Sequence, residues 1–147
     1  MTSSPAIELG QLGEAYAAAY LEQVGYRLVA ANFTLPVGRS LRGAVVTAEI
    51  DLVAYEAETL CFVEVKTRAS DWFAPPQVNV DLRKRRQVAR AARAYRQMLG
   101  IEEHPYRYDV VTVVLPGDQS TPQIELLRNF WTDESLRKHR WGSHFYD

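Results

Sequence analysis

The alternation of apolar and polar residues is strongest between Ala48 and Arg68, where it predicts a β-hairpin. Two runs, Glu49–Tyr55 and Leu60–Thr67, are rich in the β-branched and aromatic residues that favour strands. With the turn centred between Ala57 and Glu58, one face holds Ile50, Leu52, Ala54, Cys61, Val63 and Val65, and the other holds Glu49, Asp51, Val53, Phe62, Glu64 and Lys66. A slip of one residue would mix these faces, so the register is well specified.

The charged residues of this hairpin need a physical explanation. The register places Asp51 opposite Glu64 and Glu49 opposite Lys66, and like charges that face each other across strands destabilise a sheet. A shared proton, a neighbouring cation or a bound metal ion would offset the repulsion. Two carboxylates and a backbone carbonyl suit Mg²⁺ or Mn²⁺, and Lys66 could orient an attacking water. The alternative is a solvated strand face with a weak Glu49–Lys66 ion pair.

The segment Ile7–Val24 is predicted to form a helix, because it is rich in alanine, lacks proline and is followed by Gly25. One apolar stripe comprises Leu9, Leu12, Tyr16, Ala19 and Tyr20, and a nearly opposite stripe comprises Gly10, Ala17 and Leu21. Two stripes predict a helix that is buried on two sides. Glu14 lies within the second stripe, so it is expected to be a carboxylate among small and apolar neighbours. The alternative is an exposed Glu14 on a side that is merely rich in alanine.

A second helix is predicted at about Leu82–Leu99, with Asn79 or Asp81 as its cap and Gly100 at its end. Its apolar face is formed by Val88, Ala92, Tyr95 and Leu99, and the opposite face carries Arg83, Arg86, Arg90, Arg93 and Gln97. This arginine stripe either follows phosphates or is ordinary solvation. Lys84 falls on the apolar side at the helix N-terminus, so it is expected to point toward the sheet.

The remaining pattern completes an α/β domain. Further strands are predicted at Tyr26–Leu35, Tyr106–Leu115 and Gln123–Leu127, a final helix at Asp133–Trp141, and irregular connections at 36–47 and 69–79. Asp109, inside the valine-rich strand, is expected to be structural. The order α-β-β-β-α-β, followed by a weaker β-α end, predicts a central mixed β-sheet flanked by helices. Residues 1–147 form one domain, with a core at about 7–115 and a C-terminal extension at about 122–147.

Composition narrows the class of protein. A chain of 147 residues with 47% hydrophobic and 24% charged residues is typical of one globular domain. The single cysteine, Cys61, excludes an intrachain disulfide and a cysteine-based metal site. We found no bilayer-length apolar run and no signal peptide, which predicts a cytoplasmic protein without a membrane partner. The net charge is −1, but Arg83–Arg96 carries seven of the 17 basic residues and no acid, which is enough for a local nucleic-acid-binding patch.

Several motifs together resemble a known family. They are G-x-x-G-E-x-x-A-x-x-Y-L at Gly10–Leu21, E-I-D-L at Glu49–Leu52, F-V-E-V-K-x-R at Phe62–Arg68, Lys84 at the start of an alanine-rich helix, and R-Y-D-V-V at Arg107–Val111. In this order they resemble the bacterial YraN family of small proteins with a restriction-endonuclease-like fold. More widely, Asp51 with Glu64-Val65-Lys66 resembles the PD-(D/E)xK nuclease signature, as in archaeal Holliday-junction resolvases.

The resemblance implies a role for each matching residue. Asp51 and Glu64 would bind Mg²⁺ or Mn²⁺ with help from the Val65 carbonyl, and Glu14 would hold the ion directly or through water. Lys66 would position the attacking water. Arg68 and Lys84 would bind flanking phosphates.

Three functions remain open. The first is a metal-dependent endonuclease that acts on DNA rather than RNA, including branched or flap DNA, and that forms a homodimer as resolvases do. The second is a non-catalytic nucleic-acid-binding module, in which Arg86 and Arg90 matter more than Asp51. The third is a structural protein, for which Asp51→Asn would stabilise the fold by relieving repulsion.

Overall fold

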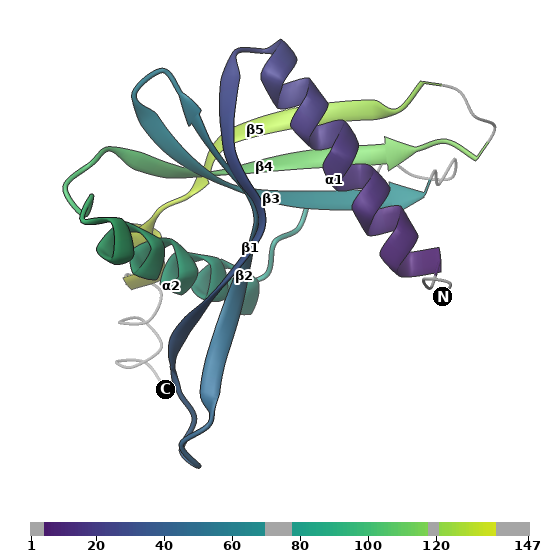
Figure 1. Cartoon of the computed structure of the whole chain (residues 1–147). Helices are drawn as coiled ribbons and strands as arrows, with labels where there is room; N and C mark the ends of the chain where they lie inside the picture. The colour runs from purple at the N-terminus through teal and green to yellow at the C-terminus, as the bar shows by residue number, and fades with distance from the viewer. Residues whose placement is uncertain (1–4, 70–77, 118–120, 138–147) are drawn as a thin grey trace.

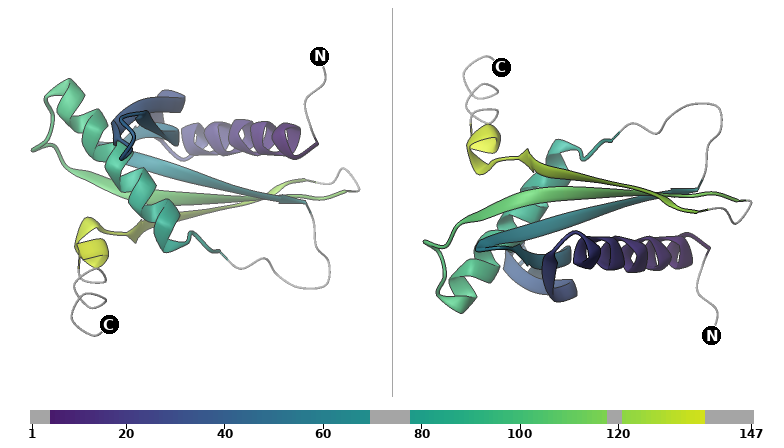
Figure 2. Two further views of the ribbon diagram at one scale, coloured as in Figure 1. Left: turned by 90° about the horizontal axis from the view of Figure 1, so that it is seen from below. Right: turned by 90° about the horizontal axis from the view of Figure 1, so that it is seen from above.

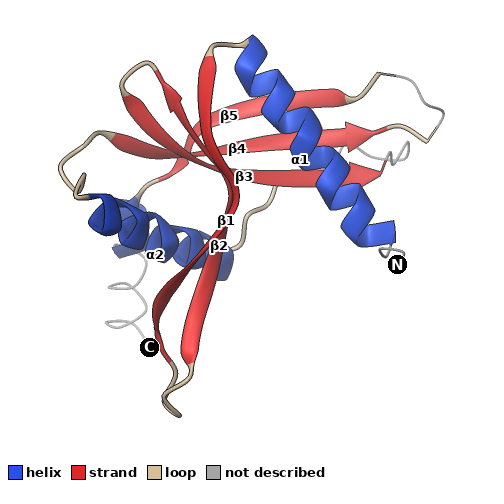
Figure 3. Ribbon diagram, in the orientation of Figure 1, coloured by secondary structure: helices blue, strands red, loops and turns tan. Residues whose placement is uncertain are grey.

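The computed structural model describes residues 5–69, 78–117 and 121–137. Its elements are α1 (Pro5–Gln23), β1 (Tyr26–Arg39), β2 (Val45–Glu56), β3 (Thr59–Ala69), α2 (Leu82–Leu99), β4 (Tyr106–Leu115) and β5 (Gln123–Trp131), followed by helical residues 133–137 (Figure 1). The predicted α/β class and element order are confirmed, and the bounds of α2 and β4 match the prediction. Figure 3 shows how the strands form one sheet with helices packed against it.

The five strands form a mixed sheet in the order β1-β2-β3-β4-β5. Three neighbouring pairs are antiparallel, and only β3 and β4 run parallel. A parallel connection needs a crossover, and α2 supplies it. Residues 60–64 of β3 and 108–111 of β4 are buried between neighbouring strands and the elements on both faces of the sheet, which explains why these parts of the sequence are mostly apolar.

The predicted hairpin register is confirmed near the turn but fails farther along the strands. Pairing runs from Glu56↔Thr59 to Leu52↔Val63 and stops there. Beyond this point β2 continues to pair with β1, and β3 continues with β4. The two strands therefore separate into a fork, and Figure 1 shows β1 and β2 turning away from β3. Ile50 consequently packs in the same cluster as Phe62, not in that of Leu52 as predicted.

Two hydrophobic clusters lie on opposite faces of the sheet. One contains Val88, Ala92 and Tyr95 of α2, packed against Phe62 and other sheet residues. The other contains Ala17 and Leu21 of α1, packed against strands β2 to β4. In Figure 2, α1 lies along one face of the sheet and the helical residues 133–137 lie on the opposite face.

The structure corrects the prediction that α1 is buried on two sides. Leu12 and Tyr16 are 49% and 37% exposed, whereas Ala17 and Leu21 are fully buried. The stripe of small residues is thus the buried one, because it allows α1 to approach β3 closely. Gly13 marks the tightest point, where an added Cβ would lie 1.8 Å from Oγ1 of Thr67.

This contact predicts opposite effects for two helical glycines. Gly13→Ala should lower the free energy of unfolding by about 1–3 kcal/mol, because overpacking forces α1 away from β3. Gly10→Ala is the matched control, since nothing lies within 4 Å of its added Cβ. It should raise stability by up to about 1 kcal/mol, through helix propensity alone. Urea unfolding of both variants checks this, and equal effects would show that the close approach does not matter.

Strands β1, β2 and β5 are longer than predicted. β1 continues through Pro36 to Arg39 and β2 begins at Val45, so the expected 36–47 loop shrinks to residues 40–44. Proline is tolerated because β1 is an edge strand, and the register shifts between Pro36 and Gly38. β5 extends to Trp131, which stacks on Tyr108 with ring centroids 4.7 Å apart.

Other expectations had mixed outcomes. Leu99 was placed on the apolar face of α2 but is 51% exposed. The predicted structural role of Asp109 is confirmed, because this buried carboxylate accepts hydrogen bonds from the Tyr26 hydroxyl (2.7 Å), Arg107 Nε (2.9 Å) and the Asn129 amide (2.9 Å). The final helix begins at Asp133 as predicted, but residues 138–141 and most of the 69–79 connection lie outside the described residues.

Candidate functional site

Asp51 and Glu64 lie at the fork, one residue beyond the last pair that joins β2 to β3. Oδ2 of Asp51 accepts a hydrogen bond of 2.9 Å from the amide of Val65. The Asp51 side chain thus accepts a backbone hydrogen bond of β3 at the point where the pairing between β2 and β3 ends. In an extended strand the N–H and C=O of one residue point to the same side. The Val65 carbonyl therefore faces the Asp51 side, as its predicted role as a metal ligand requires.

Glu64 is a carboxyl group that the fold keeps away from water. It is 4% exposed, and burial raises its pKa to about 9, with further contributions from a hydrogen bond to Asp51 and from the Asp51 charge. Lys84 Nζ lies 3.6 Å from Oε2 of Glu64 and acts in the opposite direction. The repulsion that the sequence predicted is thus relieved by a proton and a cation. Lys84 also points toward the sheet, as expected.

Helix α1 brings Glu14 to the same fork. Glu14 is half-buried, so the alternative of an exposed side chain is wrong. Burial raises its pKa to about 7, and the charges of Asp51 and Glu49 add to this shift. The position follows from the packing of α1, since Gly13, the preceding residue, contacts Thr67 on β3.

Glu49 completes a group of three acids that sequence reasoning did not assemble. Carboxylate oxygens of Glu14, Glu49 and Asp51 all lie within 4.8 Å of one another. Glu49 was expected to face Lys66, but no salt bridge joins these two residues in the described part of the chain. The E-I-D spacing was an available signal, because residues two apart on a strand share a face.

Asn32 borders this acidic group from the edge strand β1. With its amide oriented to donate, Nδ2 lies 2.8 Å from both carboxylate oxygens of Glu14 and 3.1 Å from Oε1 of Glu49. Asn32 has a φ of 50°, a left-handed conformation that asparagine tolerates better than most residues. No feature of the sequence placed Asn32 at the site.

The donor set fits a hard divalent cation. Carboxylates and a backbone carbonyl are the oxygen ligands that Mg²⁺ and Mn²⁺ prefer. Glu14, Glu49 and Asp51 offer oxygens within coordinating reach of one point, and Asp51 also contacts Glu64. The predicted ligands Glu14, Asp51 and Glu64 are therefore brought together, with Glu49 as an addition.

The predicted cations divide into two groups. Lys66 is half-buried on β3, two residues beyond Glu64, and its charge lowers the Glu64 pKa. Lys66 and Lys84 thus belong to the fork, and Arg68 follows on β3 as an exposed residue. Arg86 and Arg90 are exposed on α2, where Arg90 donates to the carbonyl of Val37 (3.1 Å). They line the other side of α2 and do not reach the carboxylates.

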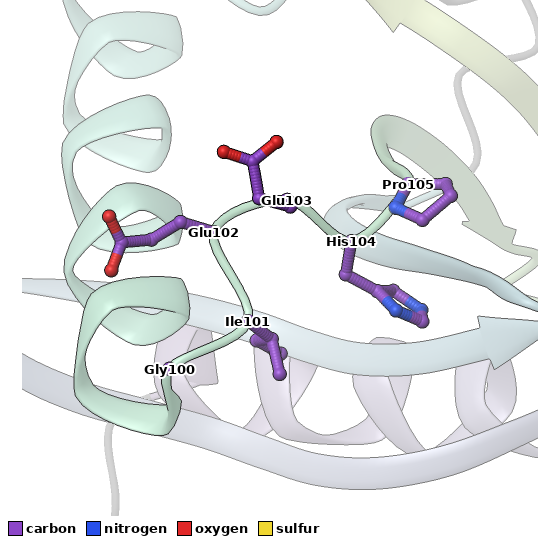
Figure 4. Close-up of a pocket in the computed structure, with 6 residues that line it drawn as sticks. All are labelled: Gly100, Ile101, Glu102, Glu103, His104 and Pro105. Carbon is purple, nitrogen blue, oxygen red and sulfur yellow. The ribbon is translucent and has the colours of Figure 1, made fainter.

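A separate hollow of about 570 Å³ lies at the turn after α2, over residues 100–105 (Figure 4). Figure 4 shows that the side chains of Glu102 and Glu103 point in different directions, so they do not form a ligand pair. His104 Nε2 lies 2.8 Å from the carbonyl of Glu58, a structural contact.

Comparisons with known proteins place the chain in a family. The model of the uncharacterised protein family UPF0102 matches residues 13–113. The chain belongs to this family. The UPF0102 protein of Moorella thermoacetica is 39% identical over 81% of this chain and 91% of its own length, and that of Solibacter usitatus is 42% identical over 81% and 82%. UPF0102 is the YraN family that the motifs resemble, so the recognition is confirmed.

A third relative covers a similar share of the chain, and one solved structure shows a weak overall similarity. The UPF0102 protein of Syntrophus aciditrophicus is 35% identical over 84% of this chain and 87% of its own length. The solved structure titled "Crystal structure of SSO0001" covers 97% of this chain and 60% of that chain at 10% identity, with a TM-score of 0.38, which is too weak to indicate a shared function. Among the described residues of this UPF0102 protein, none of the helices has the length and apolarity to span a membrane.

The position of Glu49 leads to a prediction about metal affinity. Glu49→Gln should weaken Mn²⁺ binding roughly 10- to 100-fold, because the acidic group beside Glu14 loses one of its anionic ligands. Glu58→Gln makes the same chemical change on an exposed turn and should leave affinity unchanged. Isothermal titration calorimetry of both variants checks this. If Glu49→Gln left the Mn²⁺ affinity unchanged, Glu49 would be a solvated side chain and not a metal ligand.

Proposed function

We propose that this UPF0102 protein is a nuclease that hydrolyses phosphodiester bonds of DNA with Mg²⁺ or Mn²⁺ as its cofactor. The observation that carries the proposal is the meeting of three acids at the fork. Glu14, Glu49 and Asp51 come from α1 and β2 and lie within 4.8 Å of one another, and Asp51 contacts Glu64 on β3. Like charges at this distance repel, and a bound divalent cation would offset the repulsion of all three acids at once.

Each residue then has a defined role in hydrolysis. Glu14, Glu49, Asp51, Glu64 and the Val65 carbonyl are the oxygen ligands. A cation held there would polarise the scissile phosphate and lower the pKa of a bound water. Lys66 orients that water and stabilises the negative charge that develops at phosphorus. The water oxygen would form the new bond to phosphorus and lose a proton to solvent, while the bond to the leaving oxygen would break and that oxygen would take a proton from solvent.

The cations beside the carboxylates fit DNA as the substrate. Lys84 lies at the N-terminus of α2, where the helix dipole also favours phosphate. Arg68 follows Lys66 by two residues on β3 and is exposed. Both residues can contact phosphates that flank the scissile bond. Branched and flap DNA remain the substrates to test first, as the resemblance to resolvases implies.

A second candidate function is a nucleic-acid-binding module without turnover. The observation that favours it is the exposed stripe of Arg83, Arg86, Arg90 and Arg93 on α2, which is independent of the carboxylates. This module would bind DNA equally well with or without Asp51, whereas the nuclease would bind DNA but cleave it only with a divalent cation.

Calorimetric titration with Mn²⁺ and Mg²⁺ tests the proposal first. The wild-type protein should bind metal near neutral pH, and Asp51→Ala should not, while Glu58→Ala serves as the matched control. The same variants are then incubated with flaps, junctions and single strands, and cleavage should follow metal binding. Absence of metal binding both with and without DNA would contradict the nuclease. The structural alternative predicts a marked stabilisation of metal-free Asp51→Asn in thermal unfolding together with no DNA binding and no cleavage by the wild-type protein.

A further inference from the structure

A basic groove lies on α2, away from the carboxylates. It has a volume of about 390 Å³ and lies between α2 and the helical residues 133–137. Five arginines line it, Arg86, Arg90, Arg93, Arg96 and Arg137, and Ala89 and Leu136 contribute the apolar part. The hydrolysis proposed above uses none of Arg93, Arg96 and Arg137, and of these three only Arg93 belongs to the arginine stripe of the second candidate function.

Within the described residues, no ion pair neutralises the arginines of this groove. Within residues 5–69, 78–117 and 121–137, no salt bridge joins any of the five arginines to a carboxylate. Asp133 is the acid that lines the groove. Its carboxylate accepts hydrogen bonds from the hydroxyl groups of Tyr106 and Tyr108. Two neutral donors thus hold Asp133, and the arginines keep their charge available to a ligand.

Arg96 gives an independent sign that the groove suits an anionic ligand. Its side chain is 8% exposed, and its guanidinium carbon lies 3.7 Å from the centroid of the Tyr106 ring. Its Nε is buried and has no hydrogen-bond partner among the described residues. Burying a charged donor without a partner is costly. An anion bound in the groove would supply hydrogen-bond acceptors to the guanidinium of Arg96.

We propose that this groove binds the phosphate backbone of a nucleic-acid duplex. The proposal rests on the proposed function and extends it to a second contact with the same substrate. Arginine favours phosphate because its planar guanidinium can donate two parallel hydrogen bonds. The groove and the fork share one helix, because Lys84, which contacts Glu64, lies in the first turn of α2 and Arg96 lies in its last turn.

The spacing along α2 gives the length of the contacted duplex. Twelve residues separate Lys84 from Arg96, which is about 18 Å along a helix axis. Successive base pairs are about 3.4 Å apart. A duplex that follows α2 therefore places the groove about five base pairs from the phosphate at the fork. A duplex carries phosphates at a regular spacing that can reach both the groove and the metal ligands, whereas the charges of an acidic peptide have no fixed spacing. This difference favours a nucleic acid as the ligand.

The test measures duplex binding by fluorescence anisotropy in EDTA, so that no cleavage occurs. The probe is a fluorescein-labelled 20-base-pair duplex, titrated at several salt concentrations. The groove variant is Arg93→Gln with Arg137→Gln, two exposed residues, and the matched control is Arg27→Gln with Arg42→Gln, exposed arginines outside the groove. The groove variant should reduce the slope of log K against log salt by about 2 and weaken binding roughly 10- to 100-fold. The control should match the wild type.

Arg96→Lys separates a binding role from a structural one. Lysine keeps the charge but removes Nε, so we expect weaker duplex binding with an unchanged salt slope. A lower melting temperature with unchanged affinity would mean that Arg96 only supports Tyr106, and it would remove the evidence that Arg96 contacts a ligand.

The outcomes separate this proposal from the nuclease. The groove proposal is wrong if the groove variant binds the duplex with the wild-type salt slope. It is also wrong if the wild-type protein shows no salt-dependent duplex binding. In either case, metal calorimetry still tests the nuclease proposal independently. Loss of binding in the groove variant, with no metal-dependent cleavage by the wild type, supports the groove and rejects the nuclease. Displacement of the duplex by poly-glutamate at equal charge concentration would assign the groove to acidic peptides and overturn the proposal.

Discussion

Lys66→Met should reduce DNA cleavage about 10²- to 10³-fold while metal binding changes by less than about tenfold. The expected loss is that of a single group that stabilises charge in the transition state. Methionine keeps the half-buried apolar stem of Lys66 and removes only the ammonium group. The carboxylates that bind metal remain, so the variant should separate catalysis from metal binding. The proper measurement is single-turnover cleavage at saturating Mn²⁺, with calorimetry on the same preparation.

Lys84→Met provides the matched comparison for Lys66→Met. Lys84 also lies beside Glu64, with its Nζ 3.6 Å from Oε2, but it comes from α2. Removing it should weaken the affinity for DNA and change the rate of bound substrate less than Lys66→Met does. If Lys66→Met cleaved as fast as the wild type, the proposed role of Lys66 would be wrong. If both variants lost rate equally, charge alone would matter and the position of Lys66 on β3 would not.

The fork shows why local alternation predicted the hairpin only in part. Near the turn, β2 and β3 are each other's partners, and the pattern of faces fixes the pairing from Glu56↔Thr59 to Leu52↔Val63. Beyond Leu52, β2 still pairs with β1 and β3 still pairs with β4. Each strand keeps a hydrogen-bonded neighbour on its other side, so nothing in its own sequence marks where the two strands separate. The predicted Asp51–Glu64 conflict was the only local sign.

The orientation of α1 shows a different limit. Sequence patterns could not rank the two apolar stripes, so both sides of the helix were predicted to be buried. Only the side with Gly13 and Ala17 is buried, because small residues permit the close approach to Thr67 that places Glu14 at the fork. Burial of Glu14 could thus be predicted from its stripe. The proximity of Asn32 could not, because it depends on how β1 lies beside α1.

Metal affinity should rise steeply with pH, by at least about 100-fold between pH 6 and pH 8. Burial raises the pKa of Glu64 to about 9, so the metal-free protein keeps a proton on the Asp51–Glu64 pair at neutral pH. A metal ion binds the deprotonated carboxylates, so binding must release that proton. One released proton corresponds to about a tenfold gain in affinity per pH unit. The pKa of Glu14, raised to about 7, adds a second proton at the acidic end.

Calorimetry of Mg²⁺ binding in buffers of different ionisation enthalpy measures these protons directly. About one proton should be released per ion at pH 8, and more at pH 6. Glu64→Gln removes the titrating group and should flatten the pH dependence above pH 7. No proton release by the wild-type protein at pH 8 would show that Glu64 is already ionised there, and the proposed proton sharing would be wrong.

The same pKa shift predicts how metal and pH together control stability. A carboxyl group with a raised folded-state pKa stabilises the fold fully below its unfolded pKa, and this stability is lost as the pH rises toward the folded value. For Glu64 the window runs from about 4.5 to about 9, so the metal-free protein should become less stable from pH 5 to pH 8. Saturating Mg²⁺ should reverse that loss, because it binds only the folded state. Glu64→Gln should be the more stable protein without metal and gain least from Mg²⁺, since the wild-type carboxylate serves the site at the expense of the fold.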